Sequence, residues 1–124
     1  NDTLLIARAR ALLAQNHADK AASELSALLA RAPNADPRAY VLLASAQRQI
    51  GQVDAAWQSI GHALEIEPHN PAALLERGII RERKGDLVGA RKDWQQVLDL
   101  APDSHEGDLA RQDLAVMAAD PDSP

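Results

Sequence analysis

Hydrophobic residues recur along this chain in groups that each end in a proline, at nearly constant distances. Pro33, Pro68 and Pro102 close three such groups and lie 35 and 34 residues apart. Alanine and leucine supply most of the apolar residues, as in the stretch Leu28-Leu29-Ala30-Arg31-Ala32. Both are good helix formers, whereas strands favour branched and aromatic residues. The pattern therefore predicts an all-α chain built from three consecutive repeats.

A second marker lies inside each repeat, where a residue suited to a left-handed turn is followed five residues later by alanine. Glycine adopts the left-handed conformation without strain, and asparagine tolerates it, so either residue can end a helix. The alanine that follows allows a second helix to pack closely. The marker pairs are Asn16 and Ala21, Gly51 and Ala56, and Gly85 and Ala90.

The expected starts of the helices agree with this frame. Asp36-Pro37 and Asn70-Pro71 each place a capping side chain before a proline, which the first turn of a helix tolerates. Asp103-Ser104 can cap one further helix after the last repeat. The predicted helices are 3–15, 18–31, 37–50, 53–66, 71–84, 87–100 and 104–118.

This pattern resembles the tetratricopeptide repeat family, whose unit is a helix–turn–helix of about 34 residues. The resemblance covers roughly residues 2–102 and implies a right-handed superhelical α-solenoid. The expected organisation is a single domain over residues 1–118 and a flexible tail over 119–124. Within the domain we expect repeats at about 2–35, 37–70 and 71–102, and a capping helix at about 104–118 that covers the last hydrophobic face with Leu109, Leu114 and Met117.

Most core positions of the family match, and two depart from it. With the final proline of each repeat counted as position 32, the small residue at position 8 and the large one at position 24 are present in every repeat. Position 7, usually leucine, is Arg8 and Arg77 in two repeats, and position 11, usually tyrosine, is Gln47 and Arg81 in two. Trp94 stands at position 24 and is predicted to be core. The matching residues are Leu5, Tyr40 and Leu74 at position 4; Ala9, Ala44 and Gly78 at position 8; Leu25, Ile60 and Trp94 at position 24; and Leu28, Ala63 and Val97 at position 27.

Composition and charge narrow the function classes. The 124 residues carry a net charge of −5, which argues against a nucleic-acid binder, and only 2% of them are aromatic. There are no cysteines, so disulfides, thiol catalysis and cysteine-based metal sites are excluded. No apolar run is long enough to span a bilayer. Because the first residue is Asn1 rather than Met, we expect a piece of a longer chain. The alanine-rich, cysteine-free composition is typical of a bacterial protein, and it leaves both the cytoplasm and the periplasm open.

Candidate chemistry is sparse. His17, His62, His69 and His105 share no metal-binding spacing and are expected to face solvent, so we expect no metal and no cofactor. No nucleophile elbow or phosphate loop is present, and an enzyme is not expected. The run Arg81-Glu82-Arg83-Lys84, followed by Arg91 and Lys92, is the densest positive segment. It fits a solvated helix end, or a contact with phosphate or an acidic peptide.

The candidate binding site is the concave face that the family resemblance implies, lined by the first helix of each repeat. Residues four and then three positions apart share one side of a helix. Position 5 is aliphatic in every repeat, so an open face would be an apolar stripe edged by charge. The predicted groove residues are Ile6, Arg10, Leu13, Val41, Ser45, Arg48, Leu75, Ile79 and Glu82.

The function expected from this face is protein–protein interaction, with an extended apolar peptide or an amphipathic helix as the partner. Some family members bind the C-terminal carboxylate of chaperones through a clamp of basic and Asn side chains. Its places fall here on Ile6, Arg10, Leu42, Ala72 and Glu76, of which only Arg10 is basic, so that mode is disfavoured. Two alternatives stay open: self-association through the ends of the array or through Trp57, which could equally pack between repeats, and an enzymatic or nucleic-acid accessory role.

Overall fold

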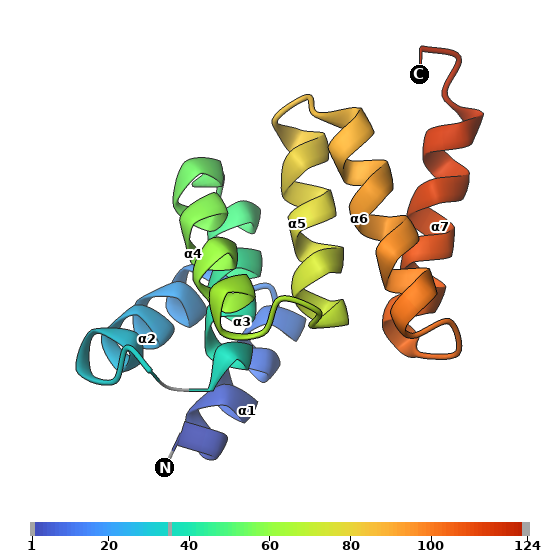
Figure 1. Cartoon of the computed structure of the whole chain (residues 1–124). Coiled ribbons are helices and arrows are strands. Elements are labelled where there is room, and N and C mark those ends of the chain that lie inside the picture. The colour runs from blue at the N-terminus through green and yellow to red at the C-terminus, as the bar shows by residue number, and fades with distance from the viewer. Residues whose placement is uncertain (1, 35, 123–124) are drawn as a thin grey trace. The chain divides into compact units, whose positions relative to one another are not determined.

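A computed structural model describes residues 2–34 and 36–122 of the chain (Figure 1). Within these residues every regular element is an α-helix, so the all-α fold is as predicted. No helix bound differs from its predicted value by more than one residue. The helices are α1 (Asp2–Ala14), α2 (Ala18–Arg31), α3 (Pro37–Gln49), α4 (Val53–Ile66), α5 (Pro71–Arg83), α6 (Leu87–Leu100) and α7 (His105–Ala119).

The chain divides into two compact units, residues 1–68 and residues 69–124. In the first unit α1 packs against α2, α2 against α3 and α3 against α4, and α3 also packs against α1. In the second unit α6 packs against α5, and α7 packs against both. The first helices of the two pairs in the first unit, α1 and α3, therefore meet, and α7 meets α5 in the same way, as in a helical repeat array.

The turn inside each repeat has the predicted left-handed residue. Asn16, Gly51 and Gly85 have φ of 64°, 85° and 88°. The backbone N–H of the residue that follows each of them donates to the carbonyl oxygen five residues earlier. His17, for example, donates to Leu12, and the distance is 2.8 Å in all three repeats. This hydrogen bond is the signature of a Schellman motif. The same local chemistry therefore reverses the chain three times.

The predicted caps are also present. The Asp36 carboxylate accepts from the Arg38 amide at 2.9 Å, and the Asn70 side chain accepts from the Ala73 amide at 3.1 Å. Ser104 is the N-cap of α7, because its hydroxyl oxygen accepts from the amide of Gly107 at 2.9 Å. These bonds satisfy amides that have no partner within their own helix. The first two prolines lie one residue further apart than the second two, and Ala35, in the segment between the first two repeats, lies outside the described residues.

Alanines set the distance between the helices of a repeat. Ala9 and Ala44 on the first helices, and Ala21, Ala56 and Ala90 on the second helices, all have no exposed surface. Each of these sites holds only a methyl group, so the backbones approach closely, and the large residue at position 24 fills the space beside them. Leu25, Ile60 and Trp94, which occupy that position, are 1%, 0% and 1% exposed.

The third repeat has the largest residue at position 24 and the smallest at position 8. Trp94 on α6 lies directly over Gly78 on α5, where an added Cβ would be 2.3 Å from the indole Nε1. The indole N–H donates to the carbonyl oxygen of Leu75 at 3.3 Å. Trp94 is therefore a core residue, as predicted, and its ring fills the space that is left because Gly78 has no side chain.

The last helix, α7, packs against α5 and α6 of the second unit through small residues. Gly107 and Ala110 are buried on the side that faces the unit, and Met117 is 5% exposed. A Cβ at Gly107 would be 2.5 Å from the carbonyl oxygen of Ala101, so only glycine allows this approach. The predicted stripe residues Leu109 and Leu114 are half-buried. The contact of α7 with α5 and α6 is the packing that a capping helix requires. The last two residues of the predicted tail over 119–124 lie outside the described residues, and the tail stays a prediction.

Replacing Gly78 with alanine tests the fit of Trp94. We expect Gly78→Ala to lower the free energy of unfolding by about 1–3 kcal/mol, because the new methyl group overlaps the indole. In a Trp94→Leu background the same change should instead raise it by about 1 kcal/mol, since alanine is the better helix former. Urea unfolding followed by circular dichroism measures both.

Gly61 provides the matched control for this experiment. It lies within α4, and a Cβ there would meet nothing within 4 Å. Gly61→Ala should therefore raise the free energy of unfolding by about 1 kcal/mol with Trp94 present. A loss at Gly78 that is as large in the Trp94→Leu background as in the wild type would contradict the proposed steric cause.

Candidate functional site

The first unit holds six of the predicted groove residues. On α1 and α3, which pack against each other, the spacing of four and then three places each set on one side of its helix. Val41 and Leu13 are half-buried, whereas Ile6 is only 2% exposed and belongs to the core. Arg10 is exposed. The accessible part of this face therefore consists of partly exposed aliphatic side chains beside a cation.

The polar residues of the α3 part are joined to one another. The Ser45 hydroxyl oxygen accepts from Nε2 of Gln49 at 3.1 Å and from Nη2 of Arg48 at 3.4 Å. Ser45 and Arg48 are half-buried, which restricts their rotamers. These bonds join the last two turns of α3 through side chains and restrain the guanidinium of Arg48.

The second unit holds the other three predicted groove residues, all on α5. Leu75 is 9% exposed and packs in the core, Ile79 is half-buried, and Glu82 is exposed. Of the aliphatic residues at position 5, only Val41 has more than a small accessible area. The predicted stripe is therefore narrower than the sequence suggests, and its accessible aliphatic residues are Leu13, Val41 and Ile79.

The start of α3 has an anionic group whose charge is stabilised by arginines. Nε of Arg38 donates to the Asp36 carboxylate at 2.8 Å, and Nη2 of the same guanidinium donates to the same oxygen. This side-chain hydrogen bonding holds the pKa of Asp36 below its ordinary value of 3.8; partial burial opposes the shift, and the charge of Arg10 adds to it. Arg10, a predicted groove residue, is therefore close enough to the α3 N-terminus to act on its cap.

The departures from the family pattern form polar contacts between the two helices of each repeat. In all three repeats the residue at position 23 of the second helix is polar and meets a polar residue at position 7 or 11 of the first. Sequence reasoning recorded the unusual residues on the first helices but not their partners. The contacts are Arg8 with Glu24 at 2.8 Å, Ser59 with Gln47 at 2.7 Å, and Asp93 with Arg77 at 2.8 Å and with Arg81 at 3.0 Å.

The contact in the third repeat is the most buried of the three. Asp93 is 2% exposed and accepts from both Nε and Nη2 of Arg77, and from Nη1 of Arg81. Burying a carboxylate is costly unless cations and hydrogen bonds compensate for the lost water, and here two arginines do so. The equivalent pair in the first repeat is exposed, with side-chain exposures of 59% for Arg8 and 37% for Glu24.

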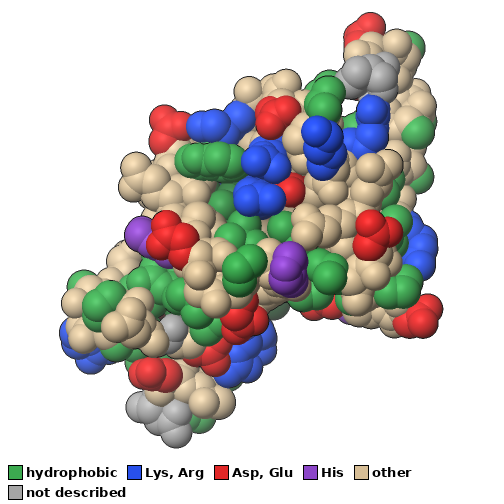
Figure 2. Space-filling view, viewed as in Figure 1, with side chains coloured by type: hydrophobic (Ala, Val, Ile, Leu, Met, Phe, Trp, Pro, Cys, Tyr) green, Lys and Arg blue, Asp and Glu red, His purple; other side chains and the backbone are tan. Residues whose placement is uncertain are grey.

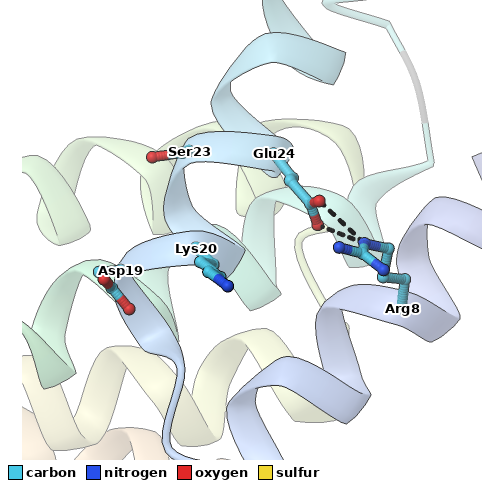
Figure 3. A pocket seen from close by; sticks show the side chains of 5 residues that line it. All are labelled: Arg8, Asp19, Lys20, Ser23 and Glu24. Atoms are coloured by element: carbon cyan, nitrogen blue, oxygen red, sulfur yellow. Dashed lines mark hydrogen bonds and ion pairs between the residues drawn. The ribbon is translucent and has the colours of Figure 1, made fainter.

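Shallow hollows lie on the second helices of the first unit. One of about 320 Å³ lies between α1 and α2, and the Arg8–Glu24 ion pair closes one side of it (Figure 3). Asp19 and Lys20 line the rest, and the Ser23 hydroxyl points away from the ion pair. The hollow is lined by two cations and two carboxylates, so its charges cancel.

A second hollow, of about 360 Å³, lies on α4 beside Trp57. Trp57 is 36% exposed, and Gly61 one turn later leaves the surface open next to it. The ring of His62 lies 5.3 Å from that of Tyr40, tilted by 40°. All four histidines are exposed, as predicted. Among the described residues no three His, Asp or Glu side chains are arranged to hold a metal ion, and no helix is long and apolar enough to cross a membrane.

Comparison with known proteins identifies a repeat family and two relatives whose sequences are similar to parts of this chain. The sequence model described as "Tetratricopeptide repeat" matches residues 6–60 and 59–105. An "FK506-binding protein-like" protein of Mus musculus is 40% identical over 63 residues, which is 51% of this chain and 18% of that protein. A TPR repeat-containing protein of Pseudomonas aeruginosa is 29% identical over 93 residues, 75% of this chain and 16% of that protein. The chain thus spans less than a fifth of the length of these relatives.

Solved structures with the same fold cover nearly the whole chain. The first TPR domain of Spaghetti (RPAP3), bound to the HSP90 peptide SRMEEVD, has a TM-score of 0.76 at 22% identity and covers 94% of this chain and 93% of its own. The translocator chaperone SycD of Yersinia enterocolitica has 0.79 at 19%, covering 94% and 81%. PcrH, in complex with the chaperone binding region of PopD, has 0.77 at 23%, covering 95% and 90%. These likenesses establish a helical repeat fold.

The two equivalent ion pairs should differ in their contribution to stability. We expect Asp93→Asn to lower the free energy of unfolding by about 3–5 kcal/mol, because two partly buried guanidinium groups lose their counter-charge. Glu24→Gln, at the same register in the first repeat, should lower it by at most about 1 kcal/mol, because water screens that pair. Urea unfolding of the two variants provides the measurement, and equal losses would show that burial does not set the difference.

The cap of α3 should depend on pH in a defined direction. Because the folded state lowers the Asp36 pKa, its stabilising contribution is complete above the ordinary value of 3.8 and is lost as the pH falls through the lowered pKa. Carboxyl NMR titration should show that pKa rising toward 3.8 in Arg38→Gln. Asp36→Ala should cost about 1 kcal/mol at neutral pH. An Asp36 pKa that is unchanged in Arg38→Gln would refute the assigned cause.

Proposed function

Because the chain belongs to the tetratricopeptide repeat family, we propose that it is a protein-interaction module that binds a partner peptide or amphipathic helix along the first helices of its repeats. The observation that carries the proposal is that a half-buried aliphatic side chain and an exposed charge occur on the same first helix, Leu13 with Arg10 on α1 and Ile79 with Glu82 on α5. An apolar stripe with charged edges fits one side of an amphipathic ligand.

The chemistry of the face favours an apolar ligand over an acidic C-terminal tail. The Spaghetti domain is bound to the acidic HSP90 peptide SRMEEVD. In this chain the places of the family's carboxylate clamp include a single cation, Arg10, and Glu76 is of the opposite charge and only 7% exposed. A buried acid at such a place repels an acidic tail. PcrH, which shares this fold, is solved in complex with the chaperone binding region of PopD, and this supports the proposal that the chain binds a segment of a partner protein.

The test compares two double variants in affinity capture from the source cells. Val41→Glu with Ile79→Glu introduces charge on the first helices at half-buried positions, where the fold should tolerate it. Ile66→Glu with Val88→Glu makes the same chemical change on α4 and α6, at side chains 46% and 51% exposed. The first pair should reduce the captured partner about tenfold or more, as loss of a central apolar contact does, and the second should leave it unchanged.

Circular dichroism of both double variants verifies that they are folded. A partner captured equally by the wild type and both variants would place its binding outside the first helices and contradict the proposal. Self-association is the alternative, favoured by Leu4 on α1 and Val116 on α7, which are 69% and 70% exposed. Sedimentation at two concentrations detects self-association. A dimer that still forms in the variant with Val41→Glu and Ile79→Glu, but is lost in Leu4→Glu, would favour this alternative.

A further inference from the structure

The densest cationic segment of the sequence lies where α5 ends and α6 begins, around the predicted groove residue Glu82. Figure 2 shows Lys and Arg side chains gathered around the connected ends of these two helices. Between residues 81 and 92 there are five basic and two acidic side chains, a net charge of +3. Since the whole chain carries −5, the rest of it carries −8. We call this surface the basic end; its basic residues are Arg81, Arg83, Lys84, Arg91 and Lys92.

The basic end is built around one anchored arginine. Arg81 extends from α5 across the first turns of α6, with its Nη1 3.0 Å from Asp93 and its Nε 3.6 Å from Asp86. Gly89 gives it room, because a Cβ there would be 3.0 Å from Cδ of Arg81. The Arg81 side chain is 25% exposed. Because the carboxylates of Asp86 and Asp93 compensate the charge of Arg81, the accessible positive charge of the basic end comes from the neighbouring basic residues.

The neighbouring cations are positioned to act together on a ligand. Arg83, Lys84 and Lys92 are exposed, and Arg91 is half-buried. The packing of α5 on α6 and the short connection between them keep these side chains within one region of the second unit. Interspersed acids are limited to Glu82 and Asp86, and the Asp86 carboxylate is already bound to the Gly89 amide at 2.9 Å. A cluster of this kind attracts anions over about a Debye length, roughly 8–10 Å in physiological salt.

We propose that the basic end binds a short acidic segment of a partner protein, through cations that are not among the predicted groove residues. Two observations favour a peptide over a nucleic acid. The stretch from residue 81 to residue 92 contains no aromatic side chain and no histidine, and the neighbouring Trp94 is 1% exposed, so the basic end offers no aromatic ring on which a base can stack. The net charge of −8 outside the basic end repels a long polyanion, whereas a short acidic segment fits within the positive region. Side chains of Asp and Glu then pair with Arg83, Lys84 and Lys92.

The experiment measures binding of a fluorescein-labelled peptide of about six glutamates to the full chain by fluorescence anisotropy. The test variant is Arg83→Glu with Lys92→Glu, two exposed positions outside the Asp93 network. The control is Lys20→Glu with Arg31→Glu, two exposed positions on α2 that change the net charge by the same amount. We expect the test variant to bind at least tenfold more weakly than the wild type, and the control to bind within about twofold of it.

Each possible outcome supports or refutes the proposal. Raising the salt from about 20 to about 150 mM should weaken wild-type binding and leave the test variant nearly unchanged. Equal losses in the test and control variants would show that only the overall charge matters, and no wild-type binding at low salt would also overturn the proposal. Tighter binding of an oligonucleotide of about six thymidines would assign the surface to nucleic acid instead. Arg83→Gln with Lys92→Gln, which adds no negative charge, should also bind more weakly and guards against a folding defect of the test variant.

Discussion

The distance between the two helices of each repeat is the constraint on which the rest of this fold depends. It is set by positions where no more than a methyl group is tolerated, such as Ala44 and Ala56, which have no exposed surface. The turn residues reverse the chain and the caps satisfy its amides, but neither determines how closely the helices pack. In the third repeat the constraint is stricter, because the Trp94 ring occupies the space where even the Cβ of an alanine would lie at Gly78. The large and small residues of a repeat are thus chosen as a pair.

The polar contacts at position 23 show how one register can serve two physical roles. Glu24 and Arg8 form an ion pair at the surface, where solvent weakens their attraction. The two side chains line one side of a shallow hollow. Asp93 takes the same place in a buried setting and requires two arginines. That requirement brings Arg81 into the interior of the α5–α6 pair and leaves the other cations of the segment at the surface. The proposed acidic-peptide surface is therefore a consequence of how a buried carboxylate is compensated.

The helices could be predicted to within one residue because their ends are encoded locally. Pro37 and Pro71 mark starts, Gly51 and Gly85 mark turns, and each acts through the backbone of its neighbours alone. The contacts between helices were harder, since Arg77 on α5 looks like an isolated departure until Asp93 on α6 is aligned with it. A signal was available, because position 23 is polar in all three repeats. The exposure of groove residues such as Ile6 could not be predicted, because it depends on three-dimensional packing rather than on helix periodicity.

The placement of the two tryptophans gives each compact unit its own optical probe. Trp57 is the tryptophan of the first unit and is 36% exposed, whereas Trp94 belongs to the second unit and is 1% exposed. The two indoles therefore experience different polarity, and their fluorescence changes upon unfolding are distinguishable. When either indole is replaced by phenylalanine, the tryptophan emission that remains comes from the other unit. Coincident transitions would mean that the units unfold as one cooperative body, and separate transitions would mean that one repeat boundary is a natural break in the array.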